Sequence, residues 1–300
     1  MSNIDITAMA MIVNVHIGLW TGFKKDKGAA TEVAETAVAH DKEAFGVTKR
    51  LISKDSIDPV CTARNAIRTH FLDRTLPWKD NGDRLLPRKM YQTFIDEHAV
   101  LEQAYFDAVE KFIADYSAER ERAVERLGKR FNRAEYPHHD DIRARFYVRV
   151  DIDAISDAKD FRVGLSKDAI ETVRSQIEEA TERRIMLAQK EVWDRIEETV
   201  THFAGRMAAQ MEEPVKGKRR APLHQSTINN LIHLVNSLPA LNIVGDPGMK
   251  AVGRKLHGLL SSYNDAETMK GNTDMCAAAH DEVQDIIAEM AAFKRAFEVA

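Results

Sequence analysis

Two stretches of the sequence, residues 88–131 and 166–211, each predict a single helix of more than forty residues. Neither contains a proline, and in the second stretch apolar residues recur at steps of mostly three and four while charged side chains fill the other faces. An average globular helix has about eleven residues. We therefore expect a mainly α protein built on a long antiparallel helical hairpin, coiled-coil-like in its packing, with a small β-sheet and a C-terminal helical segment.

Two shorter segments predict the sheet. Residues 10–18 and 145–153 alternate their side chains so that one face is apolar, which is the pattern of a half-buried strand. Because an isolated strand cannot satisfy its backbone hydrogen bonds, the two strands are expected to pair with each other. An Asn-Gly turn within residues 79–83 lies between two apolar arms and predicts a small hairpin.

The clearest boundary in the chain is the segment 214–222, which is bracketed by prolines, contains a glycine and is strongly basic. It predicts three parts. Residues 1–213 are expected to form an α-rich domain with the small sheet and the two long helices, residues 214–222 a basic linker, and residues 223–300 a C-terminal helical segment. Within that last segment, helices are expected at 225–238, 246–262 and 273–298.

The composition excludes several classes of protein. The formal net charge of −4 is nearly neutral for 300 residues, so no global field favours nucleic acid or an anionic membrane as a partner. The two cysteines are far apart, which suits a reducing cytoplasm and offers neither a disulfide framework nor a zinc motif. No apolar run reaches eighteen residues, and the apolar start lacks the basic region of a signal peptide. We expect a cytoplasmic protein without a membrane partner.

Two segments have the spacing of known binding loops without their chemistry. Residues 248–255 match the glycine spacing of a phosphate-binding P-loop, but Arg254 and Lys255 stand where the motif needs lysine followed by serine or threonine. Glycines that allow close helix packing are the preferred interpretation. A calcium loop begun at Asp151 fails because Ser156 and Arg162 occupy its sixth and twelfth positions.

The sequence His-His-Asp-Asp at residues 138–141 is the densest cluster of metal-capable side chains. Adjacent residues rarely point at one ion, and no further ligand at helical spacing accompanies them. A polar connection in which Asp140 or Asp141 caps a helix is therefore favoured over a metal site. We expect no catalytic residue, no cofactor and no metal ion, and a protein that is not an enzyme.

The basic linker carries the candidate contacts to nucleic acid, Lys216, Lys218, Arg219 and Arg220. Four cations in a loop could bind a few phosphates. A charged loop is more often simply solvated, and the long helices carry about as many acids as bases. We therefore expect any binding to nucleic acid to be weak and indifferent to sequence.

The apolar stripe of the second long helix is the candidate interaction surface, and it includes Ile196, Val200, Phe203, Met207 and Met211. Such a stripe can be intramolecular core or a surface for a partner, and the sequence leaves both uses open. Methionine and phenylalanine near one end of the helix offer adaptable apolar surface. A homo-oligomer is expected on this ground.

The first strand runs into the sequence Leu-Trp-Thr-Gly-Phe-Lys-Lys at residues 19–25. This start resembles a family of uncharacterised phage and bacterial proteins, in which a strand leads into a Trp-Ser/Thr-small-x-Lys-Lys signature. The order of later elements is similar over residues 11–213, whereas the letters match over residues 20–25. The genes of that family often lie near those of a MoxR-type AAA+ ATPase and a von Willebrand A-type protein. The resemblance implies a phage or prophage origin, the cytoplasm of a bacterial host cell and an ATPase-linked partner role, and it assigns no site.

The function favoured by these observations is non-catalytic. We expect a phage-type scaffold or adaptor that acts through protein–protein contacts, with an AAA+ ATPase as the candidate partner. The alternative is a nucleic-acid-binding accessory protein of phage replication or recombination.

Overall fold

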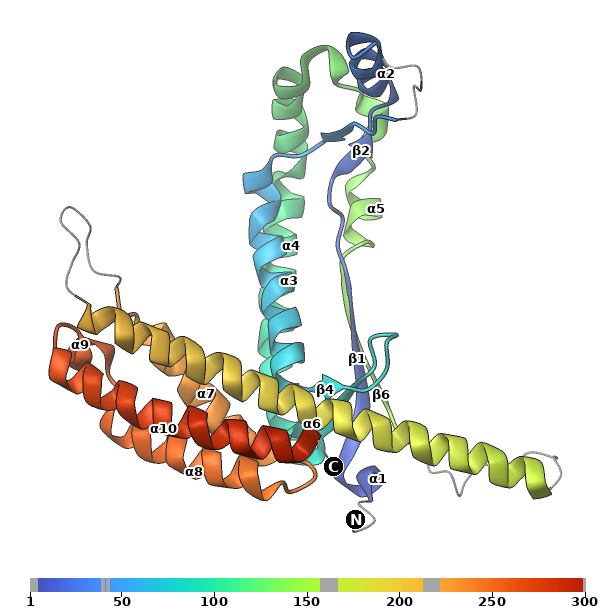
Figure 1. The fold of residues 1–300 in the computed structure, drawn as a ribbon. Coiled ribbons are helices and arrows are strands. Elements are labelled where there is room, and N and C mark those ends of the chain that lie inside the picture. Colours follow the sequence, from blue (N-terminus) through green and yellow to red (C-terminus); the bar gives the residue numbers. More distant parts are fainter. Residues whose placement is uncertain (1–4, 39–40, 42–43, 157–166, 213–221, 299–300) are drawn as a thin grey trace. The chain divides into compact units, whose positions relative to one another are not determined.

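The computed structural model describes residues 5–38, 41, 44–156, 167–212 and 222–298. The chain is mainly α with long helices and a small antiparallel sheet, as the sequence predicted (Figure 1). It divides into two compact units. Unit 1 comprises Met1–Asn14, Arg74–Tyr91 and Ile152–Ala300, and unit 2 comprises Val15–Asp73 and Gln92–Asp151.

Unit 1 contains the longest helix of the chain and the helices that follow it. Three of these helices confirm the segments expected at 225–238, 246–262 and 273–298, although α7 continues through Pro239 to Leu241. The helices of unit 1 are α1 (Ile6–Met9), α6 (Lys167–Met211), α7 (Gln225–Leu241), α8 (Pro247–Ser262), α9 (Ala266–Met269) and α10 (Thr273–Glu298), with the 3₁₀ turn η1 (Arg88–Met90).

The apolar stripe of α6 is buried by other helices of unit 1. α6 packs against α10 and α7, and both of these contact α8 (Figure 1). The other long helix, α4 (Tyr91–Leu127), belongs to unit 2. This corrects the expected hairpin, in which α4 was to cover the stripe. An amphipathic stripe predicts which face of a helix is buried, but it does not identify the helix that buries it.

The glycines at the start of α8 allow close helix packing, as expected, and do not form a P-loop. Asp246 is the N-cap, and its side chain accepts a hydrogen bond from the Met249 N–H at 3.0 Å. A Cβ atom added to Gly248 would lie 2.9 Å from the Phe293 ring. The glycine therefore allows α8 to approach α10 closely.

The small sheet has the strand order β4-β5-β1-β6, so the two predicted strands are neighbours. β5 pairs antiparallel with both β1 and β4, with Ile12 opposite Leu85 and Leu85 opposite Leu76. The predicted turn closes the β4–β5 hairpin, and Gly82 adopts a φ of +96° there. The strands are β1 (Ala10–Gly18), β4 (Leu76–Pro77), β5 (Arg84–Pro87) and β6 (Tyr147–Asp153).

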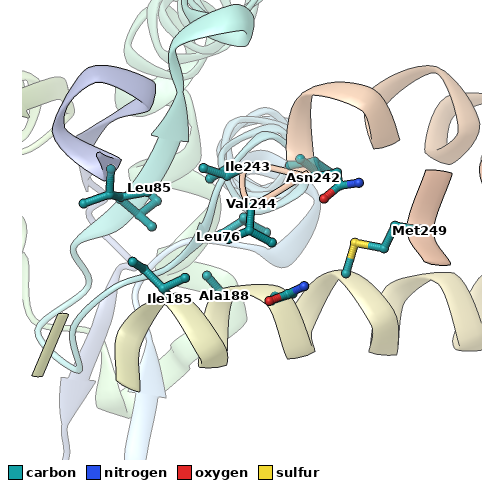
Figure 2. A pocket seen from close by; sticks show the side chains of 11 residues that line it. Leu76, Leu85, Ile185, Ala188, Asn242, Ile243, Val244 and Met249 are labelled. Carbon is teal, nitrogen blue, oxygen red and sulfur yellow. The ribbon is translucent and has the colours of Figure 1, made fainter. Parts of the chain in front are cut away.

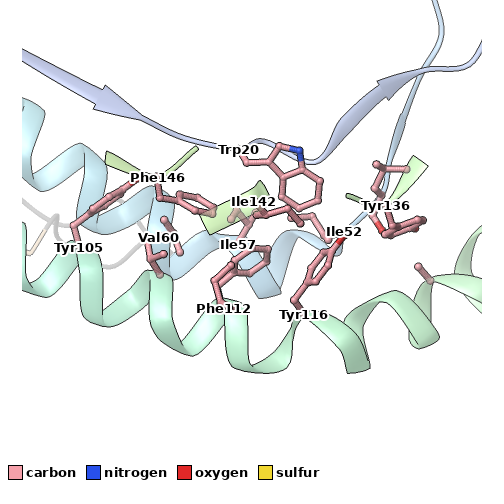
Figure 3. Close-up of a cluster of buried hydrophobic side chains, with 14 of the residues drawn as sticks. Trp20, Ile52, Ile57, Val60, Tyr105, Phe112, Tyr116, Tyr136, Ile142 and Phe146 are labelled. Atoms are coloured by element: carbon pink, nitrogen blue, oxygen red, sulfur yellow. The ribbon is translucent and has the colours of Figure 1, made fainter. Parts of the chain in front are cut away.

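Unit 2 is organised around an aromatic core (Figure 3). Trp20 packs edge-on against Tyr116 at a ring separation of 5.8 Å and contacts Phe112 at 6.2 Å. Aromatic pairs of this kind add to the stabilisation that area burial provides. Besides α4, unit 2 contains the elements β2 (Phe23–Lys25), α2 (Lys27–Thr36), β3 (Thr48–Arg50), α3 (Lys54–Arg74), η2 (Gly128–Arg130), η3 (Arg133–Glu135) and α5 (His139–Arg143).

The division into units runs differently from the three parts expected from the sequence. α6 and the C-terminal helices belong to one unit, while residues 15–73 and 92–151 form the other. The basic linker lies outside the described residues, apart from Pro222 at its end. Across the residues that the structure describes, no helix combines the length and the apolar character needed to cross a membrane.

Candidate functional site

A two-stranded ribbon in unit 2, formed by β2 and β3, presents an aromatic side chain and several cations to solvent. The antiparallel register places Phe23 opposite Arg50, Lys24 opposite Lys49 and Lys25 opposite Thr48. Opposed residues of an antiparallel pair point to the same side of the strands. One side of the ribbon, here called the ribbon face, therefore carries Phe23, Lys25, Thr48 and Arg50.

The turn before β2 anchors the ribbon to the core. Gly22 has a φ of +65°, and a Cβ atom there would lie 2.5 Å from Ile52 Cγ1, so the position requires glycine. The Gly22 carbonyl accepts a hydrogen bond from the Leu51 N–H at 2.7 Å. Trp20, two residues earlier, is buried against Tyr116. Trp20 and Gly22 of the sequence signature thus have structural roles.

The residues that follow β3 are held by α4 and by the chain beyond it. The Arg126 guanidinium donates hydrogen bonds to the carbonyls of Arg50 and Leu51, both at 2.8 Å. The Tyr136 hydroxyl donates to the same Leu51 carbonyl at 2.7 Å. These contacts fix the backbone of the ribbon at its C-terminal end.

A buried carboxylate completes this attachment. Glu119 of α4 is 2% exposed and accepts a hydrogen bond from the Ser53 N–H at 2.5 Å. Its other oxygen accepts two hydrogen bonds from the Arg122 guanidinium, at 3.0 and 3.1 Å. A buried carboxylate is tolerated when its charge is paired and its oxygens are hydrogen-bonded, and both conditions hold here.

The opposite side of the ribbon faces a network of ion pairs. Lys49 lies 2.7 Å from Glu135 and 3.9 Å from Asp26, and its ammonium group donates to the Arg130 carbonyl at 2.7 Å. Asp26 also caps α2. The pKa of Asp26 lies below its ordinary value, chiefly because the Ala29 N–H donates to its carboxylate; burial opposes this effect, and Arg130 and Lys49 reinforce it. The ribbon therefore has one fixed side.

The ribbon face remains exposed on the other side. Phe23 is 49% exposed, and the Arg50 guanidinium lies over its ring at 4.5 Å, which is a cation–π contact. Two valines of the adjoining α2 segment are exposed as well, Val33 at 41% and Val38 at 82%. Val38 has a φ of +52°, a rare conformation for a β-branched residue. Exposed apolar side chains and residues in strained backbone conformations are both typical of binding surfaces.

The ribbon was not predictable from the sequence because its strands are too short to show a period. In the sequence, the lysines at 24, 25 and 27 have the character of a basic loop, and residues 49–57 show no clear helix or strand pattern. Each strand has three residues, and they are separated by α2. The one local signal was the signature at residues 20–25, whose glycine and tryptophan are the anchors described above.

The candidate interaction stripe lies in the core of unit 1. Ile196, Val200, Phe203 and Met207 are fully buried, and Met211 is half-buried. Of the two uses that the sequence left open, the structure places these four side chains in intramolecular core. The homo-oligomer expected partly from them stays a prediction. The four linker cations, Lys216, Lys218, Arg219 and Arg220, lie outside the described residues.

A small apolar pocket in unit 1 is lined by side chains of α6, of the α7–α8 connection and of β4 and β5 (Figure 2). Its volume of about 10 Å³ matches a single water molecule. Two polar residues at its wall, Gln189 and Asn242, are already hydrogen-bonded to Asp246, each at 2.8 Å. The pocket is a packing gap beside the start of α8 and is too small for a metabolite.

A buried histidine lies between α3 and α4 in unit 2. His98 is 3% exposed and stacks on Phe94 at 5.7 Å. Neither ring nitrogen has a hydrogen-bond partner within the described residues. Burial lowers the pKa of His98 below its ordinary value of 6.5, and the neighbouring His70 lowers it further. The imidazole is therefore favoured in its neutral form when unit 2 is folded.

Replacing His98 with phenylalanine is expected to stabilise unit 2 by about 1 kcal/mol at neutral pH, because an unpaired buried polar group is removed. The gain should grow as the pH falls below 6.5, since the unfolded wild-type chain then binds a proton that the folded chain excludes. Denaturant unfolding of both proteins at about pH 7.5 and about pH 5.5 measures this difference. An equal loss of stability in both proteins on acidification would contradict the assignment.

Comparison with known proteins gives no family model that matches this chain, and no curated protein and no solved structure is similar to it.

Proposed function

We propose that this protein is a non-catalytic adaptor that binds a protein partner through the ribbon face. The observation that supports this proposal is the exposed Phe23–Arg50 pair on a backbone that α4 and Tyr136 hold in place. Aromatic residues and arginine are enriched at the energetic centres of protein interfaces. A fixed backbone lowers the entropy that binding costs.

The side chains around the pair indicate what kind of partner would fit. Lys25 lies on the ribbon face with Phe23, and Lys24 and Lys27 are exposed on the same segment of the chain. Val33 and Val38 of the α2 segment are exposed as well. A complementary partner segment would offer an apolar anchor flanked by aspartate or glutamate. The lysines would then speed association and select against basic partners.

The resemblance at residues 20–25 makes a MoxR-type AAA+ ATPase the first partner to test. In that proposal, the protein acts in the cytoplasm of a bacterial host cell as a phage-type adaptor, and it self-associates. The signature residues Trp20 and Gly22 anchor the ribbon, and Lys25 lies on the ribbon face, so the proposed docking surface includes part of the matched segment.

Replacing Phe23 and Arg50 together with alanine is expected to weaken partner binding by about 30-fold or more, because a single residue of this kind at an interface centre already contributes about 2 kcal/mol. The measurement is parallel affinity purification of wild type and variant from host cells, with retained proteins quantified by mass spectrometry. Val100→Ser is the matched control, since Val100 is 70% exposed on α4 of the same unit.

A genuine partner is retained equally by wild type and Val100→Ser and is lost with the double variant. If an AAA+ ATPase is among the proteins that behave in this way, the specific partner is supported. Identical sets of proteins for all three baits would contradict the docking role of the ribbon face.

Nucleic acid is the second candidate partner, because an exposed aromatic ring among lysines can also stack on a base and bind phosphates. Oligonucleotide binding by the same variants distinguishes the two. The adaptor proposal expects weak binding that is lost near 150 mM salt. Nanomolar binding at that salt concentration would favour an accessory role in replication or recombination. A variant with serine at Lys216, Lys218, Arg219 and Arg220 then separates the linker from the ribbon.

A further inference from the structure

The residues at the start of α5 bring three metal-capable side chains together in unit 2. The ligand atoms of His138, His139 and Asp140 all lie within 4.8 Å of one another. His138 Nδ1 is 3.3 Å from one oxygen of Asp140, and His139 Nε2 is 3.4 Å from the other. Adjacent residues rarely point at one ion, but these three side chains converge, which removes the reason for expecting no metal site here.

The local backbone explains this convergence. His138 is the N-cap of α5, which corrects the expected cap at Asp140 or Asp141; its Nδ1 accepts a hydrogen bond from the Asp140 N–H at 3.5 Å. The cap turns the His138 ring back over the first turn, and the two imidazole rings lie 3.9 Å apart. Asp140 then lies between the two ring nitrogens.

Buried residues on both sides hold this segment in place. Before it, Tyr136 is buried in the aromatic core, and the Pro137 carbonyl accepts a hydrogen bond from the Tyr116 hydroxyl at 3.1 Å. After it, Ile142 is fully buried. The three ligand side chains themselves are between 51% and 72% exposed. A fixed backbone therefore presents solvent-accessible ligands, so an ion can enter the site.

We propose that His138, His139 and Asp140 form a binding site for a divalent late transition-metal ion such as Zn²⁺. Bonds of about 2.0–2.2 Å in tetrahedral geometry place neighbouring ligands about 3.3–3.5 Å apart. Each imidazole nitrogen already lies at that distance from one of the two Asp140 oxygens, so a small rotation of the exposed side chains would bring both nitrogens to a single oxygen. Two imidazoles and one carboxylate suit zinc, copper, nickel or cobalt rather than magnesium or calcium. Three protein ligands leave at least one coordination position for water or for a donor from another molecule.

The competing explanation is an ion pair between protonated histidine and Asp140, without any metal. The two explanations differ in what the site binds. An ion pair gives no saturable metal binding, whereas a metal site binds one ion per chain and loses affinity when any ligand is removed. The His138 cap bond is long at 3.5 Å, so coordination through Nδ1 replaces a weak interaction.

The test is titration of the chelator-treated full chain with Zn²⁺ in competition with a chromophoric chelator. We expect one Zn²⁺ per wild-type chain and a loss of affinity of at least tenfold in His139→Ala and in Asp140→Asn. His202→Ala is the matched control, because His202 is an exposed histidine on α6 and its removal should leave the affinity unchanged.

Co²⁺ provides a second readout. Its visible absorption should be strong, as in tetrahedral sites, for wild type and His202→Ala, and should weaken in His139→Ala and Asp140→Asn. Circular dichroism checks that the variants are folded, which is expected because the changed side chains are exposed. Zn²⁺ affinity that is equal in wild type, His139→Ala and Asp140→Asn would overturn the proposal and leave the ion pair as the explanation.

Discussion

Replacing Ile196 with aspartate is expected to destabilise unit 1 by about 4 kcal/mol or more, because a carboxylate would be buried without a partner. Ile196 is fully buried on α6, and Trp193 and Val200 on the same face are buried with it. Since α10 and α7 cover this face, both should lose protection together with α6. Hydrogen exchange of these helices, with denaturant unfolding, measures the effect.

Leu187→Asp is the control for this variant, because Leu187 is 59% exposed on the same helix. Its expected effect is within about 0.5 kcal/mol. An equally small effect for Ile196→Asp would mean that the stripe is accessible, and would favour a partner surface over intramolecular core, the two uses that the sequence left open.

Replacing Glu119 with alanine is expected to cost about 3 kcal/mol in unit 2. The change removes the acceptor for the Ser53 N–H and leaves Arg122 and Arg126 without the carboxylate they share. Arg122 and Arg126 are partly exposed, so the expected loss of stability is smaller than for a fully buried ion pair. Equilibrium unfolding measures it, and the segment after β3 should exchange its amide hydrogens faster.

Glu121→Ala is the matched control. Glu121 is 59% exposed on the same helix, and its ion pairs with Arg120 and Arg133 lie at the surface. We expect a change within about 0.5 kcal/mol. If both variants had the same small effect, the attachment of the ribbon to α4 would not depend on the buried carboxylate.

The regular elements of this chain were largely predictable because they extend over many residues. Strands β1 and β6 show a period of two, and α4 and α6 a period near 3.6, so local pattern identifies them. The partner of α6 was not predictable, because α10 presents a stripe as suitable as that of α4. Competition between equivalent apolar faces is decided by the whole fold, and single-chain periodicity does not contain that information.

The candidate site was less predictable than the fold for a related reason. Lys49 and Asp26 form ion pairs with Glu135 and Arg130, respectively. These partners are far away in the sequence, so the network could not be predicted from it. The ribbon depends on pairing of three residues with three others across α2. At the start of α5 the ligand types were visible in the sequence, but their convergence depends on the cap formed by His138.

The most direct measurement of the central claim is site-specific photocrosslinking in host cells, with a photoreactive phenylalanine analogue placed at position 23 or at position 100. Both positions are exposed in unit 2, but of the two only position 23 lies on the ribbon face. The adaptor account predicts a discrete protein adduct from position 23 that is absent from position 100 and disappears when Arg50 is replaced with alanine. No adduct at position 23, or the same adducts at both positions, would contradict it.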